Sequence, residues 1–210
     1  VVLRTTNTIL SRGVVYALTA DDANPEVGDP LTVSLTSGDT TATFTRAVTG
    51  LRPSSAYSFK PYAVTSGNIT VYGAVTTFTT TALVTDPTSG TPTSGGATLG
   101  GTLATQTQVT VTSRGVVYAL TATNANPEAG GTGVTEPTAI AGGTAGAFTV
   151  AVTGLSYSSA YSYKPWAITT EHGRIYGPVG IFTTPAPTVT VASPTSTTLT
   201  SEGATLGGTV

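Results

Sequence analysis

Cysteine and methionine are both absent from the 210 residues of this chain, and histidine and tryptophan occur once each. Without cysteine, the chain has no disulfide, no thiolate metal ligand and no cysteine nucleophile. A single histidine also leaves the common transition-metal sites without their usual ligands. The sequence therefore predicts a fold that is held by packing alone, without a cofactor, and a protein that is not an enzyme.

Charged side chains are scarce as well. They make up 9% of the chain, against about 25% in an average globular protein. The net charge is -2 and no basic cluster occurs, which argues against nucleic acid or an anionic membrane as a partner. No run approaches the roughly 18 consecutive apolar residues of a membrane helix. The polar surface is supplied by threonine, serine and glycine, so we expect an extracellular or cell-surface location.

What the chain does contain is one sequence written twice. The segment SRGVVYALTA occurs at residues 11–20 and again, unchanged, at residues 113–122. Both copies continue with ANPE, AVTGL, SSAYS and Phe-Thr-Thr in the same order. The segment ATLGGT of the second copy, at residues 97–102, recurs once more at residues 204–209. Repetition of this extent indicates one structural unit used in tandem.

Each copy has the pattern of a β-protein. Runs rich in β-branched and aromatic residues are separated by polar or glycine-rich turns, and no segment shows helical apolar spacing. In the second copy these runs are residues 96–103, 109–121, 136–140, 147–152, 160–170 and 174–184. About seven short strands in roughly 100 residues predict an all-β fold of tandem antiparallel β-sandwiches.

Residues 47–80, AVTGLRPSSAYSFKPYAVTSGNITVYGAVTTFTT, resemble the second half of a fibronectin type III domain. The likeness lies in Gly-Leu-x-Pro, in the tyrosine six residues after that leucine, and in the closing Thr-Thr. The ATLGG and RGVVY segments are similar to those of fibronectin type III-like tandem repeats in bacterial surface proteins. The resemblance implies sandwiches of about seven strands, a fold that hosts many functions. It also implies that Tyr57 and Tyr161 form tyrosine corners, in which the hydroxyl bonds to nearby backbone.

The strand order that the resemblance implies divides the chain unevenly. We expect residues 1–80 to form a sandwich without its two opening strands, and residues 81–184 to form a complete one. Residues 185–210 then carry the opening two strands of a further sandwich. Because the surplus matches the deficit, copies are expected to join tail to head as a homopolymer. Two versions stay open: separate chains donate strands to one another, or the sequence is one period of a continuous tandem chain.

The residues expected at this join are mostly apolar. The tail supplies four candidate donors and the first copy four candidate acceptors, which are Leu199, Ala204, Leu206 and Val210, and Val1, Val2, Val14 and Tyr16. Arg46 stands where the second copy has Val150, on a strand face that should be buried. We therefore expect Arg46 either at the sandwich rim, with its stem over apolar surface, or in contact with another subunit.

The remaining polar residues favour ordinary surface roles. His172 lies in a predicted hairpin turn and is matched by Asn68 in the first copy, which favours a solvated residue over a catalytic base. The acidic loop DDANPEVGD, residues 21–29, carries oxygen ligands of the kind that bind calcium. The second copy has Thr123 and Asn124 at its first two places, which favours a solvated loop without metal.

Two surface features remain. Asn68-Ile69-Thr70 is a candidate N-glycan acceptor in an exposed turn. Tyr62 and Trp166 occupy matching positions that we expect to face outward. Exposed aromatics of this kind either seal a contact between subunits or stack on a sugar.

Together these features favour a structural subunit of an extracellular filament or surface stalk, assembled by strand complementation. One alternative is an adhesin or other binding module that recognises a glycan or a surface protein. Another is an accessory domain of a secreted polysaccharide-degrading enzyme whose catalytic part lies elsewhere. The bland composition of the loops favours the structural role.

Overall fold

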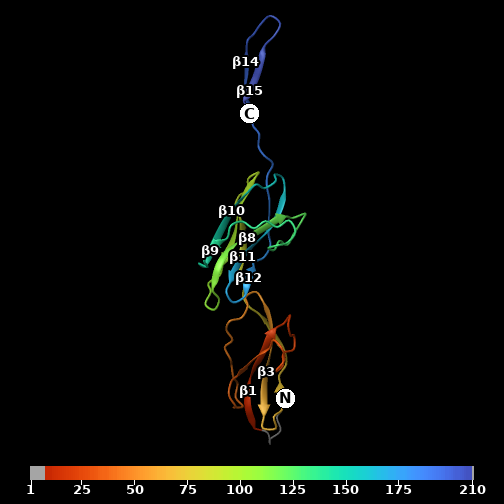
Figure 1. Cartoon of the computed structure of the whole chain (residues 1–210), viewed down its shortest axis with the longest axis vertical. Helices are drawn as coiled ribbons and strands as arrows, with labels where there is room; N and C mark the ends of the chain where they lie inside the picture. Colours follow the sequence, from red (N-terminus) through yellow and green to blue (C-terminus); the bar gives the residue numbers. More distant parts are fainter. Residues whose placement is uncertain (1–7, 210) are drawn as a thin grey trace.

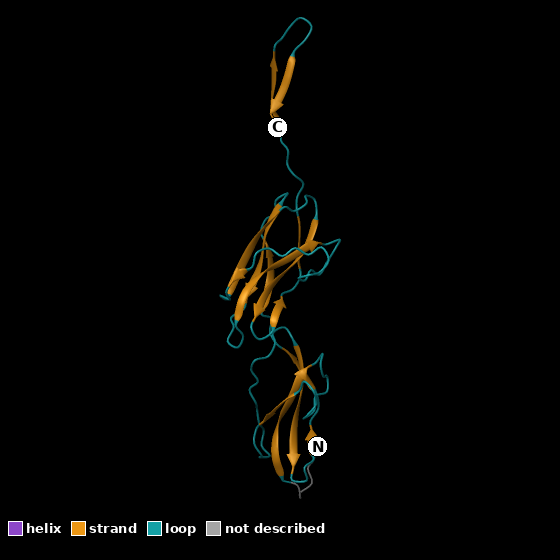
Figure 2. Cartoon of the chain, viewed as in Figure 1, coloured by secondary structure: helices purple, strands orange, loops and turns teal. Residues whose placement is uncertain are grey.

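The structure is a computed structural model that describes residues 8–209. Within these residues the chain forms β-strands joined by loops, and every strand pairing is antiparallel (Figure 2). The same residues contain no helix that is long and apolar enough to cross a membrane. An N-terminal unit (residues 8–80), a central unit (81–184) and a tail (185–209) follow one another along the long axis (Figure 1). The predicted all-β class is confirmed.

The central unit is a sandwich of two sheets. One sheet has the order β10-β7-β6, and the other has the order β12-β11-β8-β9, with β13 also paired to β11. The strands are β6 (Val84–Ser89), β7 (Gly96–Leu103), β8 (Val111–Leu120), β9 (Ile140–Ala141), β10 (Gly146–Thr153), β11 (Ala160–Thr169), β12 (Gly173–Tyr176) and β13 (Gly180–Thr183). The last run predicted from the sequence, residues 174–184, is two strands because Gly177 and Pro178 interrupt it.

The core of the central unit lies between these sheets. Val84 and Leu99 from one sheet pack with Val116 and Tyr163 from the other, and all four are at most 1% exposed. The sheets approach closely at Gly101, where an added Cβ would lie 2.7 Å from the Cβ of Pro165. Glycine is therefore required at this point of β7 by the packing of the opposite sheet.

The N-terminal unit contains one sheet in the residues that the structure describes. Its order is β2-β1-β3-β4, with β5 also paired to β3. The strands are β1 (Ile9–Leu18), β2 (Val33–Thr36), β3 (Ala56–Thr65), β4 (Thr70–Tyr72) and β5 (Thr76–Thr79). Residues 42–49 align with β10 of the central unit but do not form a strand. The expectation of a strand around Arg46 is wrong for the described residues, because no strand among residues 8–209 pairs with this segment.

The tail is a two-stranded hairpin of β14 (Ala192–Thr197) and β15 (Thr205–Thr209). Its pairing shifts register between Ala192 and Thr195, and β6 and β7 show the same shift between Thr85 and Thr88. At the matching point both hairpins have a residue with positive φ, 51° at Ser193 and 47° at Asp86. The tail therefore has the local conformation of the β6–β7 hairpin of the central unit.

Tyr57 and Tyr161 have the geometry of tyrosine corners. The hydroxyl of Tyr57 accepts a hydrogen bond from the Arg52 N–H at 2.9 Å, and the hydroxyl of Tyr161 accepts one from the Ser156 N–H at 2.9 Å. Both rings are buried. The chain reversal before β3 and the one before β11 are thus fixed in the same way.

Tyr62 and Trp166 do not face solvent, which corrects the expectation that they are exposed surface aromatics. Tyr62 is 7% exposed and Trp166 is 1% exposed. Trp166 lies opposite Gly115 in the β8–β11 pair, where an added Cβ would be 2.7 Å from the indole ring. The Arg174 guanidinium covers the ring at 4.1 Å from its centroid. The missing side chain at Gly115 and the stacked arginine together bury the indole on the outer face of the sheet.

This burial gives Trp166 a structural role that can be measured. We expect Trp166→Ala to destabilise the central unit by about 3–5 kcal/mol, the usual cost of removing a buried aromatic side chain. Tyr157→Ala is the control, because Tyr157 is 63% exposed, and its effect should stay within about 0.5 kcal/mol. Urea unfolding followed by circular dichroism measures both, and equal small effects would contradict a buried Trp166.

Candidate functional site: an open groove and an unpaired hairpin

Matching the repeats defines equivalent positions in the chain. Residues 42–80 align with residues 146–184, and residues 11–26 align with residues 113–128. Residues 81–102 align with residues 188–209 of the tail. The central unit therefore shows what each segment of the N-terminal unit and of the tail contacts in a complete sandwich.

The N-terminal unit has an open groove on the face of its sheet, with a volume of about 370 Å³. Its lining consists of Val14, Tyr16, Arg46, Val48, Leu51, Phe59 and Phe78. All of these side chains are aliphatic or aromatic except Arg46, which is charged. Of the predicted acceptor residues, Val14 and Tyr16 lie in this groove. Val1 and Val2 lie outside the described residues.

In the central unit the same positions form the core. Val116, Val152, Leu155 and Tyr163, the equivalents of Val14, Val48, Leu51 and Phe59, are all buried. The clearest contrast is at the last strand, where Phe182 is 7% exposed and its equivalent Phe78 is 37% exposed. The difference arises because β6 and β7 cover this face in the central unit, whereas no described segment covers it in the N-terminal unit.

The groove also has an unpaired backbone edge. In the central unit, β10 pairs with β7 along its whole length, from Gly146 opposite Leu103 to Thr153 opposite Gly96. The equivalent segment, residues 42–49, has no strand partner among residues 8–209. An exposed edge of this kind is a template for the addition of a strand.

The tail has the opposite defect, since it has strands but no core. Leu206 is 76% exposed, while its equivalent Leu99 is 0% exposed. Val191 is 72% exposed, while its equivalent Val84 is 0% exposed. The predicted donors Leu199 and Ala204 are exposed too, and Val210 lies outside the described residues. An isolated two-stranded hairpin is marginally stable in water. Packing against the apolar face of a sheet would therefore stabilise the tail.

The hairpin cannot fill the groove of its own chain. The N-terminal unit and the tail lie at opposite ends of the long axis, with the central unit between them (Figure 1). The tail hairpin of one copy can, however, contact the groove in the N-terminal unit of another copy.

The tail has three glycines whose equivalents in the central unit pack closely against other strands. In the central unit, a Cβ on Gly96 would lie 2.8 Å from the main-chain oxygen of Val152, and one on Gly100 would lie 2.0 Å from that of Phe148. Together with Gly101, these glycines are imposed by β10 and β11. Their tail equivalents are Gly203, Gly207 and Gly208, which within 4 Å would meet atoms of residues 191–200 alone. The tail thus keeps the shape needed to lie against strands like β10 and β11.

The pKa of Tyr16, a residue of the groove, reflects the apolar surroundings of its hydroxyl. Burial raises the pKa of Tyr16 above 10.0, and the nearby Tyr57 adds to the rise because two phenolates would repel each other. Arg46 lines the groove with its side chain exposed. This exposed place in the lining fits both positions expected from the sequence, the sandwich rim and a contact with another subunit.

The acidic loop of residues 21–29 uses its carboxylates within the unit. Asp22 accepts a hydrogen bond from the Asn24 N–H at 2.8 Å, and Asp29 accepts one from the Glu26 N–H at 3.0 Å. Glu26 pairs with Lys60 at 3.2 Å. Among the described residues, no group of three or more histidine or acidic side chains could hold a metal ion.

The other predicted surface residues lie in turns. Asn68 is exposed in the turn between β3 and β4, with φ of 55°. His172 lies in the matching turn between β11 and β12, where its N–H donates to the Thr169 hydroxyl at 3.0 Å. Its side chain is half-buried, so His172 lies in the predicted turn but is only partly exposed to solvent.

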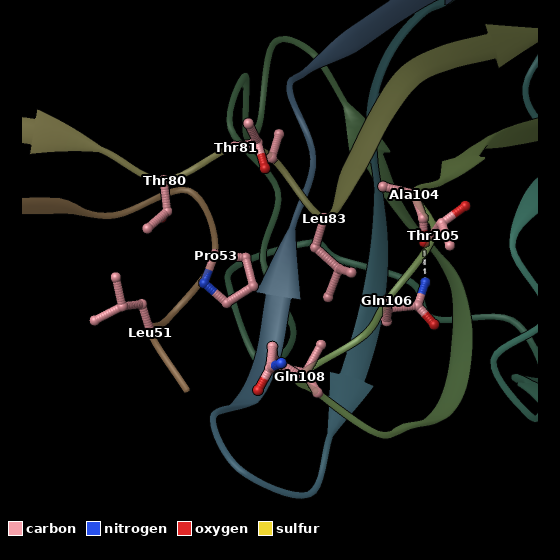
Figure 3. A pocket seen from close by; sticks show the side chains of 11 residues that line it. Leu51, Pro53, Thr80, Thr81, Leu83, Ala104, Thr105, Gln106 and Gln108 are labelled. Atoms are coloured by element: carbon pink, nitrogen blue, oxygen red, sulfur yellow. Dashed lines mark hydrogen bonds between the residues drawn. The ribbon is translucent and has the colours of Figure 1, made fainter. Parts of the chain in front are cut away.

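A second cavity, of about 170 Å³, lies at the joint between the N-terminal and central units (Figure 3). Leu51 and Pro53 reach it from the N-terminal unit, and Leu83, Gln106 and Gln108 reach it from the central unit. Its lining includes no charged side chain. The cavity lies between the two units, and its lining consists of apolar, threonine and glutamine residues.

Comparisons with known proteins give a limited result. No protein-family model matches the chain, and no curated protein matches it. Among solved structures, the sensor domain of the anti-sigma factor RsgI4 of Pseudobacteroides cellulosolvens is similar, with 14% identity and a TM-score of 0.36 over 50% of this chain and 98% of that chain. The FN1-FN3 domains of chicken CNTN1 are similar with 13% identity and a TM-score of 0.36, over 84% of this chain and 56% of that chain. Likenesses of this size identify neither a family nor a function.

Four groove residues were missed from the sequence: Val48, Leu51, Phe59 and Phe78. Each is equivalent to an apolar residue of the second copy, so matching the repeats could have found them. What the matching does not give is which of these positions remain open in the first copy.

The contrast between Phe78 and Phe182 predicts different responses to the same substitution. Phe182→Ala should destabilise the central unit by about 3–5 kcal/mol, while Phe78→Ala should leave that unit unchanged. The single tryptophan, Trp166, lies in the central unit, so its fluorescence during urea unfolding of dilute protein reports that unit alone. A shift of this transition in Phe78→Ala would show that the two units unfold together.

Proposed function

We propose that this chain is a non-enzymatic structural subunit of an extracellular filament or surface stalk. In this assembly the β14–β15 hairpin of one copy covers the open groove of the next copy. The observation that carries the proposal is that the tail repeats the β6–β7 hairpin, including its register shift and its three glycines, while residues 8–80 contain no such hairpin.

The pairing of β7 with β10 supplies the register of the proposed join. Leu99 lies opposite Val150 and Thr98 lies opposite Ala151 in the central unit. By equivalence, Leu206 of one copy would lie opposite Arg46 of the next, and Thr205 would lie opposite Ala47. Residues 42–49 would then become a strand, and Leu206 would enter the apolar groove. Burying one leucine side chain contributes about 1.5–3 kcal/mol.

A join of this kind propagates. The two surfaces that meet are different and lie at opposite ends of the molecule (Figure 1), and heterologous contacts that do not close into a ring form open chains. Strand addition of this type gives affinity through main-chain hydrogen bonds and specificity through side-chain pockets. The low content of charge and the abundance of threonine, serine and glycine support an extracellular location for the filament.

The same geometry serves a continuous tandem chain, in which the hairpin is followed by the next N-terminal unit. The two versions differ in covalent continuity, which hot detergent reveals. Non-covalent donation releases one species near 20.9 kDa, whereas a continuous tandem chain stays much larger. A binding module would instead keep its groove for a foreign ligand. Because the chain itself contains a segment that matches the groove, assembly is the better supported function.

An engineered cysteine pair tests the proposed register, since the natural chain has no cysteine. In Ala47→Cys/Thr205→Cys, we expect intermolecular disulfides, because directly opposed residues of antiparallel strands have Cα atoms about 4.5–5.5 Å apart, within disulfide range. Both residues are exposed, as are their equivalents Ala151 and Thr98. Mild oxidation should therefore give a ladder of multimers on a non-reducing gel.

The control for this experiment is Thr43→Cys/Thr205→Cys, which is displaced by four residues, or about 13 Å, along the strand. This pair should cross-link slowly and without a ladder. Equal ladders from both pairs would indicate random collision, and a ladder from the displaced pair alone would contradict the register.

The leucine of the hairpin gives an independent test. We expect Leu206→Asp to abolish filaments, because a carboxylate placed in an apolar site costs several kcal/mol unless it protonates or escapes. The central unit should keep its stability, since Leu206 is exposed in the single chain. Electron microscopy and Trp166 fluorescence measure the two properties on the same sample. Filaments that persist in this variant would overturn the proposed function.

A further inference from the structure

We infer that the join between copies is selected by a charge pair, Arg52 of one copy with Glu202 of the preceding copy. This inference rests on the proposed function and concerns how the right hairpin is chosen. The central unit shows the geometry, because the equivalent positions there are Ser156 and Gly95, and Gly95 is hydrogen-bonded to Leu155, the residue before Ser156. Neither Ser156 nor Gly95 carries a charge.

In the central unit, the turn before β7 contacts the chain reversal before β11. The Leu155 N–H donates to the carbonyl of Gly95 at 3.0 Å. Ser156 follows directly and is held at both main-chain groups, since its N–H donates to the Tyr161 hydroxyl at 2.9 Å and its carbonyl accepts from the Thr184 hydroxyl at 2.6 Å. The position beside Gly95 is therefore rigid.

The N-terminal unit has the same rigid frame around Arg52. The Arg52 N–H donates to the Tyr57 hydroxyl at 2.9 Å, and its carbonyl accepts from the Thr80 hydroxyl at 2.7 Å. Its side chain is exposed. The backbone of Arg52 is thus already in the conformation that it needs to receive a hairpin, before any hairpin arrives.

The tail supplies the opposite charge at the matching place. Glu202 aligns with Gly95 and is exposed in the single chain. A Cβ added to Gly95 would meet, within 4 Å, the main-chain oxygen of Leu155 alone, at 4.0 Å. A side chain at this position is therefore accommodated, and in the join it would begin beside Leu51 and Arg52.

The charge pair distinguishes two hairpins of similar shape. The chain contains the β6–β7 hairpin with Gly95 and the β14–β15 hairpin with Glu202, and it contains two sheet faces that such hairpins can cover. With the tail hairpin, Arg52 gains a carboxylate, whereas the β6–β7 hairpin would leave Arg52 without a counter-charge. Specificity is a difference between two affinities, and here one opposite charge supplies the difference.

The expected size of this effect is modest. Exposed ion pairs typically contribute about 0.2–1 kcal/mol, which corresponds to roughly a 1.4- to 5-fold change in an equilibrium constant. Charges at an interface mainly guide encounter and choice of partner. The apolar groove supplies the affinity, and the pair Arg52–Glu202 supplies selectivity and salt dependence.

A charge swap in the full chain tests the inference. On the Ala47→Cys/Thr205→Cys background, the rate of disulfide formation between copies is measured for Arg52→Glu, for Glu202→Arg and for the double swap. Each single swap places like charges together, so we expect cross-linking to slow by about 2- to 10-fold. The double swap restores the pair at unchanged net charge and should return to within about twofold of the parent. At 1 M salt, where the Debye length is about 3 Å, the differences should shrink.

The outcomes separate this inference from the proposed function. A ladder in the parent with no slowing in either single swap would overturn the charge pair and leave the strand join in place. A double swap as slow as the single swaps would also overturn it, because the substitutions would then act without the pair. The absence of any ladder in the parent would overturn the join itself.

Discussion

The apolar face of a β-sheet needs a second layer, because a sheet buries its hydrophobic residues against another element and not against itself. The central unit meets this requirement with β6, β7 and β10, and its core residues are almost fully buried. The N-terminal unit has an equivalent face built from equivalent residues, but the described chain supplies no layer to cover it. The open groove, the unformed strand at residues 42–49 and the exposed hairpin are three consequences of this one constraint.

The tail is shaped for a contact that it does not make within its own chain. Glycine in a strand weakens it, since glycine loses backbone entropy and has no side chain to pack. Gly203, Gly207 and Gly208 therefore cost stability in an isolated hairpin, whereas their equivalents let β7 lie against β10 and β11. Covering the groove would couple two events, the docking of the hairpin and the formation of a strand by residues 42–49.

Much of the fold could be predicted from the sequence, because repetition and strand periodicity are local signals. The run at residues 96–103 is β7, and the run at 160–170 is β11 within one residue. Trp166 shows where this reasoning stops. Periodicity places Trp166 on the outer face of its strand, but its burial depends on Gly115 and Arg174, which are distant in sequence.

The candidate site was predictable in part for the same reason. Leu206 and Val14 were recognisable as apolar residues of surplus and incomplete segments, since equivalent residues occur in the second copy. The environment of Arg52 was not, because it depends on a contact between Leu155 and Gly95 that links segments about 60 residues apart. Such a pairing becomes visible after the register of the sheets is known.

Hydrogen exchange at two protein concentrations tests the central claim most directly. Amides of residues 42–49 have no strand partner among residues 8–209, so they should exchange rapidly in dilute protein. At concentrations where copies assemble, protection should appear in residues 42–49 and in residues 204–209 together. Protection that appears elsewhere on assembly, while both of these segments continue to exchange rapidly, would contradict the claim that one copy completes the sandwich of the next.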